Sequence, residues 1–434
     1  MSKLSMLKSP ELLSPAGSLK SMRCAFAYGA DAVYAGQPRY SLRTRNNEFS
    51  QEVLESAIEE AHQQKKYFFV ASNIISQNNK IKTYIRDLTP VVEAKPDALI
   101  MADPGLIMLV RETWPDLPVH LSVQSNVMNY QAVKFWKSTG VSRIILSREL
   151  SIDEIAEIRE HCPDIELEVF VHGALCMAHS GRCLLSGYFN HRDPNQGACT
   201  NSCRWDYKVK PVVKDEWGNA VSPQKTEKIQ YVVEETNRPG EHHAIEEDEF
   251  GTYIFNSKDL RAIQHIETLT KMGVDCFKIE GRTKSSFYTA RTAQLYRKAI
   301  DDAFQGKPFD MSLMDQLEGL STRGYTEGFY RRHVPEEYQS YQNKTTSELK
   351  QQVVGEFSDY RDGWLTVEVK NQFAMGDKLE IMTPGSQQFL TLEAMEDTQG
   401  NKVERAAGSG LTVKIQTEKP VGDLTHGFLI RHWE

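Results

Sequence analysis

The sequence contains no long apolar stretch. No run of apolar residues approaches the roughly 20 that a helix needs to cross a membrane. The opening stretch, MSKLSMLKSPELLSP, contains lysines but lacks the apolar core of about 7–15 residues that marks a secretory signal. These absences predict a soluble cytoplasmic protein without a membrane partner.

Several motifs of common enzyme classes are also missing. No GxGxxG or GxxxxGK[ST] follows a predicted strand, so binding of dinucleotides or nucleoside triphosphates through these loops has no support. HExxH and GxSxG, which carry catalytic residues of many zinc proteases and serine hydrolases, are absent as well. Positive charge is in deficit, because 51 Lys and Arg residues face 59 Asp and Glu residues. The net charge of −8 argues against indiscriminate nucleic-acid binding but is compatible with one local basic face.

Four of the seven cysteines lie close together. Cys176, Cys183, Cys199 and Cys203 follow the spacing CxxxxxxC, fifteen residues, CxxxC. Disulfides, a zinc site, an iron–sulfur cluster, or thiols that are only packed or redox-active would each explain this group. Disulfides require an oxidising compartment, and the CxxxxxxC pair is wider than usual zinc knuckles. Since thiolates also bind iron in clusters, the four cysteines are candidate metal ligands, with an iron–sulfur cluster favoured.

Residues 1–305 alternate short apolar runs with longer amphipathic ones. The predicted strands are Glu11–Leu13, Ala32–Ala35, Tyr67–Ala71, Ala98–Ala102, Val119–Ser122, Arg143–Leu146, Glu166–Val171 and Cys276–Glu280. The predicted helices include Ser18–Tyr28, Gln51–Gln64, Lys80–Ala94, Pro104–Thr113, Gln131–Ser138 and Ile152–His161. This repeated order is typical of a parallel sheet with helical crossovers, and about eight units favour an α/β fold of the (β/α)8 TIM-like barrel type over a doubly wound sheet.

Polar side chains follow most of the predicted strands. TIM barrels carry their chemistry at these strand ends, although Ser, Asn, Asp and Gly there are explained equally well as turn and cap residues. Arg148, His172, Glu280 and Arg282 are less expected in turns and are therefore candidate site residues. Arginine is the natural clamp for a carboxylate, because its fork matches both oxygens.

The remaining chain is predicted to form an insertion, a linker and a second domain. The insertion, residues 172–250, carries the four cysteines and would stand at the active face of the barrel. In the linker, residues 306–350, aromatic and basic side chains either contact nucleic acid or pack on the barrel. Those residues are Arg323, Tyr325, Arg331 and Arg332. Six short alternating segments within residues 351–434 predict a small all-β domain, a closed six-stranded barrel.

Several stretches resemble the collagenase-like peptidase family, the thirty-second family of peptidases of unknown mechanism. They are EVFVHGALCMAHSGRCLLSGYF, ELLSPAGSLKSMRCAFAYGADAVYAG, CRW at 203–205 and KIEGR at 278–282. The resemblance covers nearly the whole chain, including the C-terminal β domain. ELLSPAG and DPNQGACTNSCRW resemble most closely the branch that takes part in hydroxylating the wobble uridine of tRNA to 5-hydroxyuridine.

The resemblance implies a tRNA hydroxylase with a 4Fe-4S cluster. Prephenate would be the hydroxyl source, and tRNA and the iron–sulfur assembly machinery would be partners. Cys176, Cys183 and Cys199 match the family's cluster cysteines, and Cys203 is predicted as the fourth ligand. The Arg323–His333 run and the β domain would hold the tRNA.

Roles for the strand-end residues follow from this expectation. Prephenate carries two carboxylates, so Arg148 and Arg282 are predicted to anchor it, with Arg43 and Arg45 as reserves. His172 and Glu280 are predicted to handle protons beside the cluster.

Two other functions stay open. A peptidase would pair Cys176 with His172 or His179, but it would not require three further cysteines nearby. Related family members hydroxylate ribosomal RNA or act in quinone synthesis. The other cysteines, Cys24, Cys162 and Cys276, are expected to belong to the core.

Overall fold

The computed structural model describes residues 8–42, 48–175, 179, 182, 195, 258–320, 324–331, 351–417, 421 and 423–433, together with short strand segments between 213 and 253. Several predicted site residues lie outside these described residues. They are Arg43, Arg45, Cys176, Cys183, Cys199, Cys203, Arg323 and Arg332.

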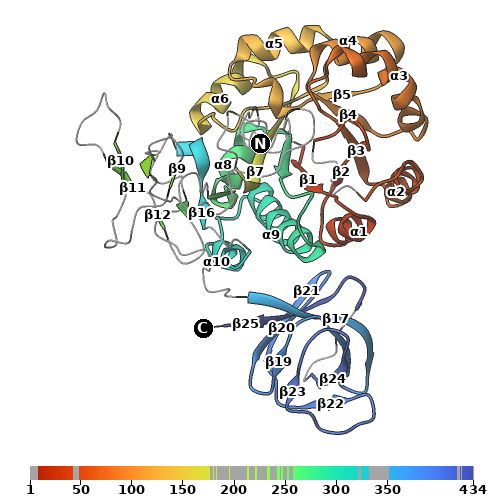
Figure 1. Cartoon of the computed structure of the whole chain (residues 1–434), viewed down its shortest axis with the longest axis vertical. Helices are drawn as coiled ribbons and strands as arrows, with labels where there is room; N and C mark the ends of the chain where they lie inside the picture. The colour runs from red at the N-terminus through yellow and green to blue at the C-terminus, as the bar shows by residue number, and fades with distance from the viewer. Residues whose placement is uncertain are drawn as a thin grey trace.

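Eight parallel strands close into a barrel (Figure 1). They are β1 (Glu11–Pro15), β2 (Ala32–Gly36), β3 (Tyr67–Ser72), β4 (Ala98–Met101), β5 (Val119–Leu121), β6 (Arg143–Ile145), β7 (Glu166–Ala174) and β15 (Cys276–Ile279). Each strand pairs with its neighbour, and β15 pairs with both β7 and β1. This closure confirms the (β/α)8 barrel and excludes the doubly wound sheet, since a doubly wound sheet keeps two open edges.

Helices surround the barrel on its outside (Figure 1). They are α1 (Leu19–Ala27), α2 (Gln51–Gln63), α3 (Asn78–Glu93), α4 (Pro104–Thr113), α5 (Tyr130–Ser138), α6 (Ile152–His161), α8 (Ile266–Met272) and α9 (Ser286–Phe304). Ser18, Ser50 and Ser151 accept backbone N–H groups at the starts of α1, α2 and α6, as their sequence positions predict. None of the described helices is both long and apolar enough to cross a membrane.

Two short strands that the sequence pattern did not predict extend the barrel sheet. β14 (Asp259–Arg261) pairs antiparallel with the end of β7, and β16 (Tyr325–Thr326) pairs with β14. The predicted linker therefore contributes β16 to the barrel sheet, and it also contains α10 (Ser312–Glu318). Strands of two or three residues are too short to show an alternating pattern, so sequence periodicity does not reveal them.

The described residues between 213 and 253 form six short strands in three antiparallel couples, and all of these strands except the last lie within the predicted insertion. β8 (Val213–Lys214) pairs with β9 (Ala220–Val221), β10 (Val232–Glu234) with β11 (His242–Ala244), and β12 (Glu246–Glu247) with β13 (Thr252–Tyr253).

The C-terminal domain is all-β and antiparallel. Its strands are β17 (Gln351–Arg361), β18 (Trp364–Val369), β19 (Phe373–Ala374), β20 (Lys378–Thr383), β21 (Ser386–Thr391), β22 (Met395–Asp397), β23 (Arg405–Ala406), β24 (Thr412–Gln416) and β25 (Phe428–His432). Seven form one sheet and β19–β23 a second, so the expected count of six was too low. The predicted segment QFLTLEAM is two strands, β21 and β22, which are the two edges of the large sheet. Because only residues 392–394 join these edges, the sheet curls into a barrel-like shape.

A buried ion pair joins the two domains. Arg291 on α9 donates from Nη2 to both carboxylate oxygens of Glu380 on β20, at 2.6 Å each. The His432 ring lies 2.8 Å from the same carboxylate, and Tyr28 donates to the Met382 carbonyl. Met382, with Phe428 and Ile430, belongs to the apolar core of the barrel domain. The domains are therefore packed through a shared core.

Candidate functional site at the barrel mouth

We call the carboxyl ends of the barrel strands the mouth, and the stretch of residues 176–203 the cysteine-bearing segment. Three of its residues are described. The Asn126 side chain, after β5, donates to the His179 backbone carbonyl at 3.3 Å. Arg182 donates to a backbone carbonyl of the same connection at 2.9 Å, and the Ile75 N–H, after β3, donates to the Asn195 carbonyl at 3.1 Å. These contacts support the prediction that the segment stands at the active face.

Arg148 and Glu280 meet at the mouth. Arg148 follows β6, Glu280 follows β15, and Nη2 of the arginine lies 2.9 Å from Oε2 of the glutamate. A second hydrogen bond runs from Nη1 to the Ala174 carbonyl at 2.7 Å, and the guanidinium stacks 3.8 Å from the centre of the Phe170 ring. Both side chains keep some exposure, 12% for Arg148 and 15% for Glu280. A partly exposed guanidinium held in this way has the chemistry to bind a carboxylate.

Arg282 crosses from the loop after β15 to the loop after β2. It donates to the Ser41 hydroxyl at 2.7 Å and to the Leu42 carbonyl at 2.8 Å. A Cβ atom added to Gly36 would lie 2.5 Å from its Nη1 and 2.6 Å from the Ser41 hydroxyl, so a larger residue at position 36 would require these two side chains to shift. The loop continues into Arg43 and Arg45. Arg282 therefore lies next to the loop that bears the other predicted anchors.

His172 occupies a different environment. It is almost fully buried between β7 and α9, where its ring contacts Tyr288, Tyr296 and Tyr325. Burial lowers the pKa of His172 to about 3, with the positive charges of nearby residues adding to the effect. The ring is neutral at physiological pH and its nitrogens lie near the Tyr296 and Tyr325 hydroxyls at 3.3 and 3.4 Å. This packing argues against the predicted exchange of protons with a substrate.

The two described candidates for RNA contact, Tyr325 and Arg331, have different surroundings. Tyr325 packs against His172 and under the Arg261 guanidinium, 4.9 Å from its ring centre. This use of its ring argues against the predicted stacking on a base. Arg331 remains more than half exposed beside Glu327, so RNA contact by Arg331 stays a prediction.

A charged network fills part of the barrel interior, beneath the mouth, and sequence reasoning missed it. Lys278 lies 2.8 Å from Glu168, and Arg143 lies 3.4 Å from Glu168 and 2.7 Å from Glu11. The Lys278 ammonium also lies 4.4 Å from the centre of the Tyr34 ring. Charged residues inside predicted barrel strands were the signal, since strands buried on both faces seldom carry them.

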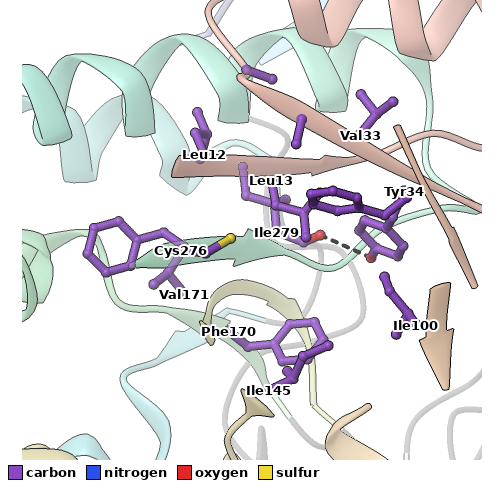
Figure 2. Packing of buried hydrophobic residues seen from close by; sticks show 14 of the residues in the cluster. Leu12, Leu13, Val33, Tyr34, Ile100, Ile145, Phe170, Val171, Cys276 and Ile279 are labelled. Carbon is purple, nitrogen blue, oxygen red and sulfur yellow. Dashed lines mark hydrogen bonds between the residues drawn. The ribbon is translucent and has the colours of Figure 1, made fainter. Parts of the chain in front are cut away.

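Apolar and aromatic side chains complete the interior. Figure 2 shows Leu13, Tyr34, Ile145 and Phe170, from four different strands, near the middle of the barrel. Tyr34 donates to the Ile279 carbonyl at 3.1 Å, which ties β2 to the end of β15.

The three cysteines outside the cysteine-bearing segment belong to the core, as expected. Cys24, Cys162 and Cys276 are buried free thiols, and burial raises the pKa of the Cys24 thiol to about 12 and that of Cys276 well above its ordinary value. Among the described residues, no three His, Cys, Asp or Glu side chains gather as a metal site. The four cysteines of the cysteine-bearing segment lie outside the described residues, so the iron–sulfur cluster that they could hold stays a prediction.

A closed (β/α)8 barrel, a cysteine-bearing stretch that follows β7 in the sequence, and a C-terminal β domain define the class of this protein. The chain belongs to peptidase family U32: the family matches residues 17–340, and the C-terminal domain of the family matches residues 350–431.

Several relatives of the chain carry RNA-related names. The chain is 58% identical to tRNA hydroxylation protein P of Escherichia coli (strain K12), over 98% of this chain and 97% of that protein. It is 56% identical to the protein of the same name from Haemophilus influenzae (strain ATCC 51907 / DSM 11121 / KW20 / Rd), over 98% and 96%. A more distant relative is the 23S rRNA 5-hydroxycytidine C2501 synthase of Escherichia coli (strain K12), 31% identical over 67% of this chain and 39% of that protein.

Proposed function

We propose that this protein is an enzyme of tRNA hydroxylation. The observation that carries the proposal is the identity of 58% and 56% with two tRNA hydroxylation proteins, each spanning almost both full chains. Identity of this extent over both domains favours a shared reaction rather than a shared fold alone. The fold is compatible with the proposal, since the mouth combines arginines with a segment rich in thiolate ligands.

The reaction that we propose in detail is conversion of the wobble uridine to 5-hydroxyuridine, with prephenate as the hydroxyl donor. Prephenate carries two carboxylates, and two arginines, Arg148 and Arg282, stand at the mouth. Arg148 would bind one carboxylate while stacked on Phe170, and Arg282 would bind the other while held by Ser41. Glu280 would orient Arg148 and remains the candidate for proton handling.

A 4Fe-4S cluster held by Cys176, Cys183, Cys199 and Cys203 is part of the proposal. Replacing C5–H of uridine by C5–OH with a hydroxide equivalent releases two electrons and a proton, so the reaction also needs an external electron acceptor. The four cysteines would hold the cluster, which would supply one-electron transfer towards that acceptor. The contacts of His179, Arg182 and Asn195 with the mouth loops support a position of the segment near the anchoring arginines.

Two alternatives deserve a test. The similarity to a ribosomal RNA hydroxycytidine synthase makes ribosomal RNA the second candidate substrate. Proteolysis has less support: His172, one of the two histidines that could activate Cys176, is buried among tyrosines, and burial lowers its pKa to about 3, which makes it a weak base.

The decisive experiment measures the nucleosides of bulk tRNA by mass spectrometry. Cells that lack the gene would be grown without oxygen, so that an oxygen-dependent route cannot mask the defect. We expect 5-hydroxyuridine derivatives to disappear, and to return with the wild-type gene but not with Cys176→Ala. Cys162→Ala is the matched control, because that thiol is buried at the end of α6 and should be dispensable. Unchanged tRNA in the deletion strain would reject the proposal and direct the search to ribosomal RNA.

The cluster has an independent test. Protein purified without air should be brown and contain iron and sulfide in near-equal amounts. A colourless protein that contains zinc would reject the cluster while leaving the RNA substrate open.

A further inference from the structure

The outer wall of the barrel next to the mouth carries exposed positive charge. Arg39 lies in the loop after β2, and Lys82 and Arg86 lie on α3, one turn apart. The Arg39 and Arg86 side chains are 63% and 73% exposed. Asp87 is the carboxylate that these two arginines share, so the group has an excess of positive charge in a chain whose net charge is −8. We call Arg39, Lys82 and Arg86 the basic wall.

A buried support holds the two arginines in place. Arg39 Nη1 lies 2.5 Å from one Asp87 oxygen, and Arg86 donates to the other from Nε and Nη2 at 3.0 and 2.9 Å. Tyr40, itself 1% exposed, donates to Asp87 at 2.8 Å, and its hydroxyl lies 2.9 Å from Thr83. The carboxylate is thus fixed from the inside, while the arginines keep their other N–H donors towards solvent.

The basic wall is continuous with the candidate site. Two residues after Arg39, Ser41 accepts the hydrogen bond from Arg282. The next residue, Leu42, donates from its backbone to Asn73 at the end of β3. Ile75 in the same connection contacts the cysteine-bearing segment. If one monomer of a polyanion is bound at the mouth, the neighbouring monomers would therefore lie along the basic wall.

Phosphate groups of a nucleic acid are the anions that fit this arrangement. Ion pairs at a protein surface contribute little to stability, so Arg39 and Arg86 can share their donors with a phosphate at small cost. Arginine binds phosphate in a bidentate manner, and contacts of this kind fix the position of RNA without reading its sequence. We propose that the basic wall binds the phosphate backbone of tRNA beside the nucleotide that enters the mouth. This proposal rests on the proposed function and adds the surface that receives the partner.

The test compares two double variants of the full-length protein. Arg39→Gln/Arg86→Gln removes both arginines of the wall. Arg23→Gln/Arg361→Gln removes two exposed arginines elsewhere that also pair with one carboxylate each, Glu60 and Asp359. Both changes lower the net charge equally. Filter binding would measure the affinity of each variant for unmodified tRNA at salt concentrations from about 50 to 200 mM. Over this range, affinity that comes from phosphate contacts falls steeply.

We expect Arg39→Gln/Arg86→Gln to weaken tRNA binding about 10-fold, with the control close to wild type. The slope of log affinity against log salt concentration should become less negative by about 1.5, because each phosphate contact contributes about 0.7–0.9. Arg39→Lys/Arg86→Lys should restore much of the slope, since it keeps the charge. Thermal melting checks that all variants fold.

Three outcomes are distinguishable. A wall variant with the affinity and slope of wild type would overturn the basic wall while leaving tRNA hydroxylation intact. Equal losses in the wall variant and the control would also overturn it, because they would reflect net charge alone. Wild-type protein that does not bind tRNA at all would overturn the proposed function together with its surface.

Discussion

Two arginine–glutamate pairs of similar geometry have different surroundings. Arg148 and Glu280 meet at the barrel mouth at 2.9 Å, with side chains 12% and 15% exposed. Arg291 and Glu380 meet between the two domains at 2.6 Å, with both side chains 1% exposed. The first pair faces the candidate site, whereas the second is enclosed by His432, Gln387 and the shared core.

The difference in exposure predicts different roles: the mouth pair can bind a ligand, and the interface pair holds the two domains together. A fully enclosed carboxylate has no water to replace a lost partner, so its arginine is needed for folding. A partly exposed arginine can give up a hydrogen bond to its glutamate and bind a substrate carboxylate instead, because water can then hydrate the glutamate. We therefore expect substitutions at the interface pair to change stability, and substitutions at the mouth pair to change substrate affinity.

The largest expected effect is on stability. Arg291→Met leaves the Glu380 carboxylate buried without its main counter-charge, and should lower the free energy of unfolding by about 3–5 kcal/mol in urea denaturation. Arg291→Met/Glu380→Gln should recover much of that loss, because the buried charge is gone. Arg23→Met, which breaks an exposed pair with Glu60, should cost less than about 1 kcal/mol. Equal losses for Arg291→Met and Arg23→Met would contradict the assignment.

Substitution of Arg148 in the mouth pair should change substrate affinity rather than stability. Arg148→Gln should raise the KM for prephenate in tRNA hydroxylation about 10–100-fold, as expected for loss of a charge-assisted pair worth about 1.5–3 kcal/mol. The matched control is Arg159→Gln: this arginine is 13% exposed, close to the 12% of Arg148, and loses a pair with Asp275 at 2.8 Å. That arginine follows no barrel strand end, so its KM should stay near wild type. Similar KM values for Arg148→Gln and wild type would remove Arg148 from the site.

Acid should weaken the interface between the two domains. Burial alone would raise the Glu380 pKa, but hydrogen bonds from His432 and Arg291 outweigh it and hold the pKa below its ordinary 4.5. A lowered folded-state pKa stabilises the fold above the unfolded-state value, and this stability is lost as pH falls through the folded-state value. The urea midpoint of wild type should thus fall more steeply below about pH 4.5 than that of Arg291→Met/Glu380→Gln. Parallel curves would exclude Glu380 as the titrating group.

The smallest effect is expected at His172. Because the pKa of this ring is about 3, it is neutral throughout the physiological range and does not set an inflection in the pH–activity profile near neutrality. His172→Gln, which can still hydrogen-bond to the tyrosines, should retain activity within about 10-fold. A loss of about 10²–10⁴-fold at unchanged stability would instead restore His172 as an acid–base residue.

Much of the barrel could be predicted from local sequence alone. Each strand from Glu11 to Cys276 is an apolar run next to an amphipathic helix with a visible start, as at Ser151 with its reciprocal Glu154 contact. These signals involve residues that are only a few positions apart, so they can be recognised without knowledge of the fold. The strand ends that carry Arg148, Glu280 and Arg282 followed from the same pattern.

The side-chain directions could not be predicted in this way. The sequence pattern placed His172 and Glu280 directly after strands, but β7 continues to Ala174, so His172 lies within it and is turned towards α9, whereas Glu280 follows β15 and is turned towards Arg148. The register of β7 and β15 shifts between Lys278 and Ile279, and strand periodicity does not reveal such an irregularity. Tyr325 likewise occupies a strand that pairs with β14, far away in sequence.

The sequence by itself determined the order of the eight barrel strands and the helices between them, the all-β character of the second domain and the cysteine spacing, because these depend on neighbouring residues. The tertiary structure alone decided which charges meet. Arg291 and Glu380 are 89 positions apart, Arg148 and Glu280 are 132 apart, and Arg39 and Asp87 are 48 apart. Such pairs form only when barrel closure and domain packing bring distant segments into contact, and burial then decides which of them stabilise the fold and which stay accessible to a ligand.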